Sequence, residues 1–241
     1  MSTFAPYILR VIRRNGGLGG HSLSEHFAIH AEWKRQLSIR RSPLELEMPW
    51  ITHFAERLIR HHLELDCAGR GKVFEFGSGG SSVYLRQRAA EVVTVEHDPE
   101  WFQAVTGYAE GKGMKMQGLF LVEPERGQFA SGDVSDPSKY CSADPPHAAN
   151  TFKAYASLID NYLEDYFDLV IVDGRSRPSC LVHAMPRIRV GGLLVLDNAE
   201  REYYLRHVSV DPVCFELLES CCGALVATNI FTQTNVWRRI A

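Results

Sequence analysis

The sequence predicts an α/β fold in which a mostly parallel sheet has helices on both faces. Short runs of β-branched and apolar residues alternate with segments whose apolar residues have helical spacing. Four of the apolar runs end in acidic or other polar residues. The carboxyl ends of parallel strands meet at one edge of a sheet, and ligands bind there. The sequence therefore predicts both a fold class and the place of its functional site.

Composition is that of an ordinary globular protein. The chain has 241 residues, of which 45% are hydrophobic and 23% charged, so we expect one large domain or a domain with an extension. No apolar run approaches the ~18 residues of a membrane span, and the first residues lack a secretory pattern. The six cysteines are scattered, which favours a reduced, cytoplasmic protein without a structural zinc site.

Charge divides the chain unevenly. The first 41 residues hold seven basic and two acidic residues, or +5, and the whole chain carries −3, which leaves −8 for the remainder. We predict a helical N-terminal extension over residues 1–48 and a catalytic domain over 49–241. The basic extension is expected to contact a second copy in a homodimer, although contact with an anionic partner is an alternative. The acidic remainder argues against nucleic acid as a partner.

Apolar spacing predicts three helices before the first strand. They cover residues 4–14, the stretch from Ser22 or Ser24 to about Arg41, and residues 51–63. A glycine-rich break separates the first two helices, and a proline ends the second.

The first strand, Val73–Phe76, leads into a run of glycine and serine, and a helical pattern begins at Val83. Glycine lets the backbone approach a ligand closely because no Cβ intervenes. The helix start presents free N–H groups at the same place. Alone, such a turn is a weak indication of nucleotide binding.

The second strand, Val92–Glu96, ends in an acid, and His97-Asp98-Pro99 begins the next helix. Glu96 lies 21 residues after Glu75, where an acid can accept two hydrogen bonds from a ribose diol. The alternative is a surface acid that caps the next helix.

The remaining elements follow the same alternation. We predict strands over residues 116–122, 168–173 and 192–198, helices over 152–162, 178–188 and 211–221, and a closing hairpin of 223–231 with 234–240. The irregular stretch 123–150 is rich in Pro, Asp, Ser and Gly. A loop of this length in a compact domain is typical of a lid or a disordered segment, and we expect a lid.

Glu75-x-Gly77-x-Gly79, followed by Glu96, resembles the first two motifs of class I S-adenosylmethionine-dependent methyltransferases. The resemblance covers roughly residues 50–240. It implies a Rossmann-like, doubly wound, mostly parallel seven-stranded sheet with an antiparallel C-terminal hairpin. A dinucleotide-binding fingerprint would place glycine where this chain has Ser82.

The resemblance implies S-adenosylmethionine as cofactor and methyl transfer to oxygen on a small-molecule acceptor. Glu75 would face the amino-acid end of the cofactor. The residues that the resemblance assigns to cofactor binding are Glu75, Gly77, Ser78, Gly79, Ser81, Ser82, Glu96, His97 and Asp173.

Asp173, Asp197 and Asn198 end neighbouring strands and offer hard oxygen ligands that suit Mg²⁺. This constellation looks like the metal site of catechol-type and caffeoyl-CoA-type O-methyltransferases, in which the metal lowers the pKa of the attacking hydroxyl. The alternative is that these residues orient the substrate and cap helices without a metal.

One departure from those families concerns the general base. They tend to carry Lys three residues after the first Asp, whereas this chain has Ser176, flanked by Arg175 and Arg177. Arginine is always protonated and makes a poor base, but it suits an anionic substrate.

The predicted catalytic residues are Asp173, Arg175 and His147, of which His147 lies in the expected lid. Other histidines considered as bases are His53, His97 and His183. Trp50 and Trp101 are expected in the core or stacked on a ligand, and Arg201, Tyr203 and Tyr204 line the acceptor pocket or begin a solvated helix.

Three other functions stay open from sequence alone. They are metal-independent N- or O-methylation of a metabolite or glycan, nucleoside binding without catalysis in an interaction module, and NAD(P)-dependent oxidoreduction.

Overall fold

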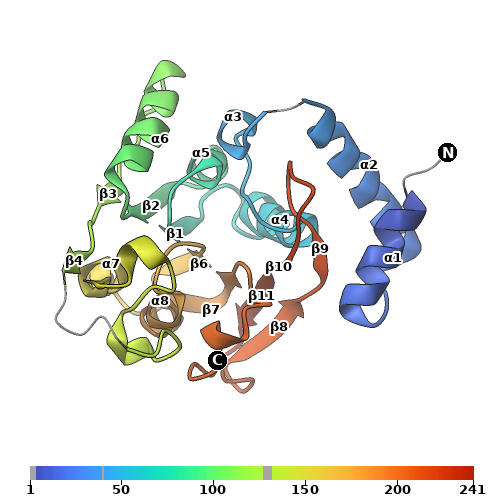
Figure 1. Ribbon diagram of the computed structural model, residues 1–241. Coiled ribbons are helices and arrows are strands. Elements are labelled where there is room, and N and C mark those ends of the chain that lie inside the picture. The colour runs from blue at the N-terminus through green and yellow to red at the C-terminus, as the bar shows by residue number, and fades with distance from the viewer. Residues whose placement is uncertain (1–3, 40, 127–131) are drawn as a thin grey trace.

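The computed structural model describes residues 4–39, 41–126 and 132–241 (Figure 1). Its centre is a seven-stranded sheet with the strand order β3-β2-β1-β6-β7-β11-β8, in which β11 alone runs antiparallel to its neighbours. The strands of this sheet are β1 Lys72–Phe76, β2 Glu91–Glu96, β3 Leu119–Leu121, β6 Phe167–Val172, β7 Ile188–Leu196, β8 Phe215–Glu219 and β11 Asn235–Arg239. The predicted seven-stranded, mostly parallel α/β fold is confirmed.

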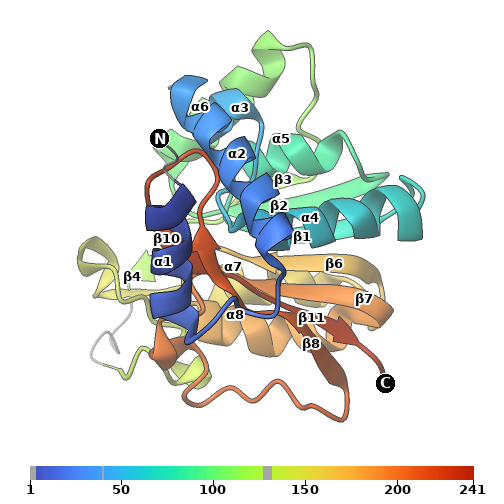
Figure 2. The same ribbon diagram turned by 90° about the vertical axis from the view of Figure 1, so that its right-hand side faces the viewer.

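Helices surround the sheet (Figures 1 and 2). The α-helices are α1 Phe4–Asn15, α2 Leu23–Ile39, α3 Pro43–Leu46, α4 His53–His61, α5 Gly80–Arg86, α6 Pro99–Gly111, α7 Lys153–Ser157 and α8 Arg177–Ala184. A π-helical turn, His62–Asp66, extends α4, and short 3₁₀ turns extend α7 and α8. The predicted helices over residues 4–14 and 51–63, and the helix predicted to begin at His97-Asp98-Pro99, agree with α1, α4 and α6 within a few residues.

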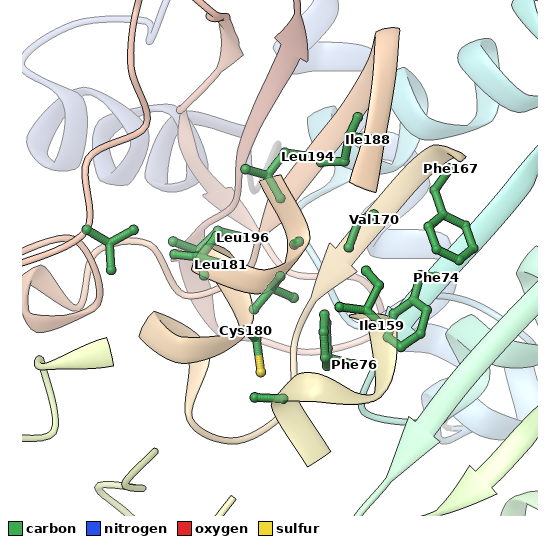
Figure 3. Packing of buried hydrophobic residues seen from close by; sticks show 14 of the residues in the cluster. Phe74, Phe76, Ile159, Phe167, Val170, Cys180, Leu181, Ile188, Leu194 and Leu196 are labelled. Carbon is green, nitrogen blue, oxygen red and sulfur yellow. The ribbon is translucent and has the colours of Figure 1, made fainter. Parts of the chain in front are cut away.

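The two faces of the sheet have separate apolar cores because side chains alternate along each strand. On one face, Phe74, Phe76, Val170 and Val172 pack against α7 and α8 (Figure 3). On the other, Val73 and its neighbours in the sheet pack against α4 and α5. Strands buried on both faces read as continuous apolar runs, which is why the central strands could be predicted.

Two expectations at the C-terminal end are wrong. Residues 211–221 are not a helix, because Phe215–Glu219 form the edge strand β8. Short apolar runs fit either period, and pairing with β11 decides between them. Residues 223–231 do not pair with 234–240 either. The antiparallel pair that closes the sheet consists of β8 and β11, while β9 (Cys222–Ala224) pairs with β10 (Phe231–Gln233).

The N-terminal helices α1 and α2 lie beside β9 and β10 (Figure 2). Tyr7, Val11 and Ile29 form a third apolar cluster with Phe231 of β10. The Trp33 indole also donates a hydrogen bond of 2.6 Å to the carbonyl of Thr228. The N-terminal helices are therefore packed on the rest of the chain, and the boundary at residue 48 stays a prediction.

The irregular stretch 123–150 is closed at its ends by the two-stranded pair β4 (Glu125–Arg126) and β5 (Asn150–Thr151). Residues 127–131 of the expected lid lie outside the described residues. Its described remainder holds two 3₁₀ turns, Pro137–Lys139 and Pro145–His147, and the Pro137 carbonyl accepts a 2.7 Å hydrogen bond from Ser179 in α8. Within the described chain, no helix is both long and apolar enough to cross a membrane.

Candidate functional site

The carboxyl ends of four neighbouring strands lie along one edge of the sheet. The register pairs Phe76 of β1 with Val95 of β2 and with Val172 of β6, and pairs Val172 with Leu196 of β7. The residues at or just after the ends of these strands therefore lie side by side, as the sequence predicts. They are Gly77, Glu96, Asp173 and Asp197.

The turn after β1 requires glycine. Gly77 has a φ of +92°, and a Cβ there would lie 3.1 Å from the Cα of Gly174 in the turn after β6. The Gly77 N–H donates to the carbonyl of Val95 at 2.9 Å, and the Gly79 N–H donates to the Ser82 hydroxyl at 3.0 Å. The backbone is thus held tightly between two strands at the start of α5.

Glu75 lies beneath this turn and is buried. Its Oε2 accepts hydrogen bonds from the hydroxyls of Ser82 at 2.7 Å and Thr94 at 2.9 Å. Its Oε1 has no hydrogen-bond partner among the described residues. Burial outweighs the hydroxyl donors and raises the pKa of Glu75 to about 6. This carboxylate holds the glycine turn and keeps one oxygen available for a further donor.

Glu96, also buried, has donors on both oxygens. Oε2 accepts from the Ser78 N–H at 2.8 Å and hydroxyl at 2.7 Å, and Oε1 accepts from the N–H groups of His97 at 2.7 Å and Asp98 at 2.9 Å. Burial alone would raise its pKa, but His97 and the backbone donors of Asp98 and Ser78 outweigh burial and lower it to about 2. The Glu96 carboxyl is therefore ionised at any physiological pH.

His97 connects the glycine-turn side of the edge to the irregular stretch. The Arg175 Nε donates to its Nε2 at 3.2 Å, and a second nitrogen of Arg175 pairs with Asp144 at 3.0 Å. The His147 ring lies edge-on to the His97 ring, with centroids 5.2 Å apart. The His97 Nδ1 is 2.8 Å from a Glu96 oxygen but has no hydrogen-bond partner of suitable angle.

Trp101 covers the outer side of the glycine turn. Its indole N–H donates to the Ser78 carbonyl at 2.7 Å, and 41% of its surface is exposed. It comes from the first turn of α6, which Asp98 caps by accepting from two backbone N–H groups. The expected core position of Trp101 is wrong, because an apolar pattern does not distinguish the core from the rim of a ligand site.

Arg177 lies between the two acidic strand ends. Its guanidinium pairs with Asp173 at 2.9 Å and lies 4.0 Å from a carboxylate oxygen of Asp197. It also donates to the backbone carbonyls of Asp173, Gly174 and Asp197. The side chain is buried, and its face lies over the Tyr204 ring.

The partners of Asp197 and Asn198 come from the end of the chain. Asp197 accepts a 2.7 Å hydrogen bond from the Thr234 hydroxyl, and the Asn198 amide donates to Thr232 at 3.0 Å. Burial and the nearby Asp173 raise the pKa of Asp197 to about 8, despite Arg177. Asp173, 27% of whose side chain is exposed, has a pKa raised to about 6 by burial.

This arrangement does not fit a divalent cation held by Asp173, Asp197 and Asn198. The Arg177 guanidinium already supplies the positive charge between the two carboxylates. Among the described residues, a different group has the spacing of metal ligands: His21, Glu219 and Cys221. In that group, the Glu219 oxygens already accept from the His21 ring and the Cys221 N–H.

A cavity of about 390 Å³ opens beside Arg177. It is bounded by the turn after β6, the amino end of α8 and the described part of the irregular stretch. Its polar lining residues include Ser142, Asp144, Arg175, Arg177, Arg201 and Tyr203. The volume suits a small molecule.

The predicted catalytic residues are only partly brought together. Arg175 lines the cavity, whereas Asp173 and His147 are not among the residues that line it: Asp173 pairs with Arg177, and His147 contacts His97. His53 is buried at the start of α4, and His183 pairs with Asp160 at 2.7 Å. Arg201, Tyr203 and Tyr204 line the cavity, and the same residues begin and form a 3₁₀ turn, so their predicted role in an acceptor pocket stays a prediction.

Sequence reasoning missed three contributors. The sequence analysis gives Arg177 no role of its own. Its position four residues after Asp173 could have indicated the ion pair between them. Thr234 had no signal, since its contact with Asp197 spans 37 residues. For Tyr155 of α7 the sequence predicts only a helical position. In the structure its hydroxyl lies where a Cβ on Gly174 would be.

The chain matches no protein-family model, and no curated protein sequence matches it. Solved structures do resemble it. An rRNA methylase from Streptococcus thermophilus has a TM-score of 0.52 at 12% identity, over 78% of this chain and 96% of that one. An O-methyltransferase from Bacillus cereus in complex with SAH has a TM-score of 0.51 at 12% identity, over 98% and 100%. The chain therefore has the Rossmann-like fold of these methyltransferases.

Proposed function

We propose that the protein is an S-adenosylmethionine-dependent methyltransferase that methylates an oxygen of a small molecule without a metal ion. The observation that carries this proposal is the glycine turn with a carboxylate on each side, next to a cavity lined by arginine and tyrosine. The likeness to an O-methyltransferase in complex with SAH supports the same cofactor.

The strand edge fits that cofactor. The turn at Gly77 admits a ligand close to the backbone, and the Oε1 of Glu75 is a buried acceptor without a partner in the described chain. Glu96 is ionised, and its two bonds from Ser78 are the ones that a ribose diol would replace. Bound here, S-adenosylmethionine supplies a methyl group on a positively charged sulfur for in-line displacement.

The other residues act on the acceptor. Arg175 joins His97 to Asp144 and so links the cofactor side to the proposed lid, residues 123–150. Burial and the neighbouring His97 lower the pKa of His147, so that it is neutral at physiological pH. We assign the acceptor proton to His147, which lies beside His97 at the margin of the cavity, and we propose that Arg175 orients the acceptor, with Asp173 acting through its ion pair with Arg177.

Calorimetric titration with S-adenosylhomocysteine tests the cofactor assignment. The wild type should bind with micromolar affinity, and Glu96→Ala should weaken binding by about 10- to 100-fold, because charge-assisted hydrogen bonds contribute ~1.5–3 kcal/mol. Glu100→Ala, an exposed acid in the first turn of α6, is the matched control. Absence of binding to the wild type would exclude the proposal.

Turnover measurements test the metal and the acceptor. A screen of hydroxylated small molecules with methyl-labelled cofactor identifies a substrate. Turnover of that substrate should then be the same with Mg²⁺ and with a chelator, because Arg177 holds the position between the carboxylates. Loss of turnover in chelator would restore the magnesium interpretation.

We also propose that the protein acts in the cytoplasm as a homodimer through its N-terminal helices, and that nucleic acid is not its substrate. The net charge of −3 and the small volume of the cavity support a small-molecule acceptor. Light scattering of the full chain tests the dimer, and deletion of residues 1–48 should give a monomer if the helices form the contact.

A further inference from the structure

We propose that the acceptor carries an oxyanion, a carboxylate or a phosphate, which Arg201 and the amino end of α8 bind within the cavity. This inference rests on the proposed function and names the chemical class of its substrate. It follows from the charges around the cavity and from the backbone at its floor.

The cavity has one more positive charge than its ion pairs use. Arg175 pairs with Asp144 at 3.0 Å, and Arg177 pairs with Asp173 at 2.9 Å. Arg201 donates to the Tyr204 hydroxyl at 3.1 Å, and no carboxylate of the described chain lies within ion-pair distance of it. A ligand that enters beside Arg201 therefore meets an arginine that has no ion-pair partner among the described residues.

The amino end of α8 adds backbone donors to the same cavity. Ser176, the residue before the helix, has a φ of +48° and does not cap the first turn with its side chain. Its hydroxyl donates to Ser179 at 3.0 Å instead. Ser176, Arg177 and Pro178 line the cavity, and of these Ser176 and Arg177 carry a backbone N–H, whereas Pro178 does not. The uncapped first turn and the helix dipole favour an anion at this point.

The positive charge at the cavity contrasts with the net negative charge of the whole chain. The chain as a whole carries −3, yet the cavity is lined by three arginines and the single acid Asp144 among the described residues. Tyr203 adds a hydroxyl on the Arg201 side. An acceptor with one oxyanion would complete the pairing, and a neutral acceptor of the same shape would leave Arg201 without a counter-charge.

Calorimetry with two simple anions provides the test. Benzoate and inorganic phosphate are titrated separately into the full chain saturated with S-adenosylhomocysteine. At least one should bind in the millimolar range, and Arg201→Gln should weaken that binding tenfold or more. Arg206→Gln removes an exposed arginine that does not line the cavity and should leave the affinity unchanged. The anion that binds more tightly assigns carboxylate or phosphate.

Two outcomes would overturn the inference: neither anion binds the wild type, or Arg201→Gln binds as tightly as the wild type. Tyr203→Phe gives a second readout and should weaken binding by a smaller factor. The affinity for S-adenosylhomocysteine, measured on every variant, separates the two proposals. If the wild type does not bind that cofactor product, the proposed function fails, and the anion titration is then repeated on the unliganded chain.

Discussion

The two ends of the strand edge hold their carboxylates in opposite ways. At the glycine turn, which we propose as the cofactor end, Glu96 accepts two hydrogen bonds from Ser78 and two from the N–H groups that follow it, and its pKa is about 2. At the acceptor end, Asp173 and Asp197 share one guanidinium, and burial raises the pKa of Asp197 to about 8. The first end keeps its charge until the pH falls towards 2, whereas the second exchanges protons between about pH 6 and 8.

This difference gives the ends opposite effects on stability. The pKa of Glu96 is lower in the folded chain than in the unfolded chain, so its contribution is present above about pH 4.3 and is lost as the pH falls towards 2. The pKa of Asp197 is raised on folding, so its contribution is complete below about pH 3.9 and is lost as the pH rises towards 8.

Arg177→Ala should have the largest effect, because it leaves Asp173, which is ionised at pH 7, and the buried Asp197 without their shared guanidinium. We expect the free energy of unfolding at pH 7 to fall by about 3–5 kcal/mol, measured by urea denaturation. The loss should be smaller at pH 5, where Asp173 and Asp197 are largely protonated. Arg206→Ala, at an exposed position, is the control. A loss under 1 kcal/mol at pH 7 would show that Arg177 does not neutralise the pair.

Asp197→Asn should sharpen the comparison through its pH dependence. The variant lacks the titrating Asp197 carboxyl. Relative to the wild type, its free energy of unfolding should therefore rise by about 1.4 kcal/mol per pH unit within the window from pH 5 to 8. The asparagine oxygen can still accept from Thr234. Urea denaturation across this range measures the slope, with the exposed Glu110→Gln as control. Parallel curves for variant and wild type would show that Asp197 does not titrate in this window.

The cofactor end was largely predictable from sequence, and the reason is local. Glu75, the glycines and Glu96 belong to one strand-turn-helix-strand unit, and the hydrogen bond from Ser78 to Glu96 spans 18 residues. Glycine at Gly77 and a Pro-containing cap before α6 are residue choices that few other structures need. The order of elements and the glutamate positions therefore followed from short patterns.

The acceptor end was predictable only in its strand ends. Asp173 and Asp197 could be placed because they follow apolar runs, but the guanidinium between them depends on how α8 begins. Thr234 reaches Asp197 because β11 lies next to β7. The sequence predicts a helix where the structure has β8, so it does not predict how the closing strands pair. Contacts across the closing strands are set by tertiary pairing, which no local period encodes.

Gly174→Ala tests the turn after β6, which lies between the two ends of the strand edge. A Cβ there would overlap the Tyr155 hydroxyl, so we expect a loss of about 1–3 kcal/mol in the free energy of unfolding. Adding Tyr155→Phe should recover part of this loss, because it removes the overlapping oxygen. Gly107→Ala in α6, where no atom lies within 4 Å of the added Cβ, should instead stabilise by up to ~1 kcal/mol. No recovery in the double variant would show that the strain lies in the backbone turn.

Trp101→Phe should have the smallest effect, and that effect should be confined to the proposed cofactor end. The indole donates one neutral hydrogen bond, to the Ser78 carbonyl, so its loss should weaken S-adenosylhomocysteine binding by less than tenfold. Because Trp101 is 41% exposed and lies on the glycine turn, it should also report binding by a change in fluorescence. That change should disappear in Trp101→Phe and persist in Trp50→Phe, which removes another exposed tryptophan. A signal that persists without Trp101 would mean that the cofactor binds away from this turn.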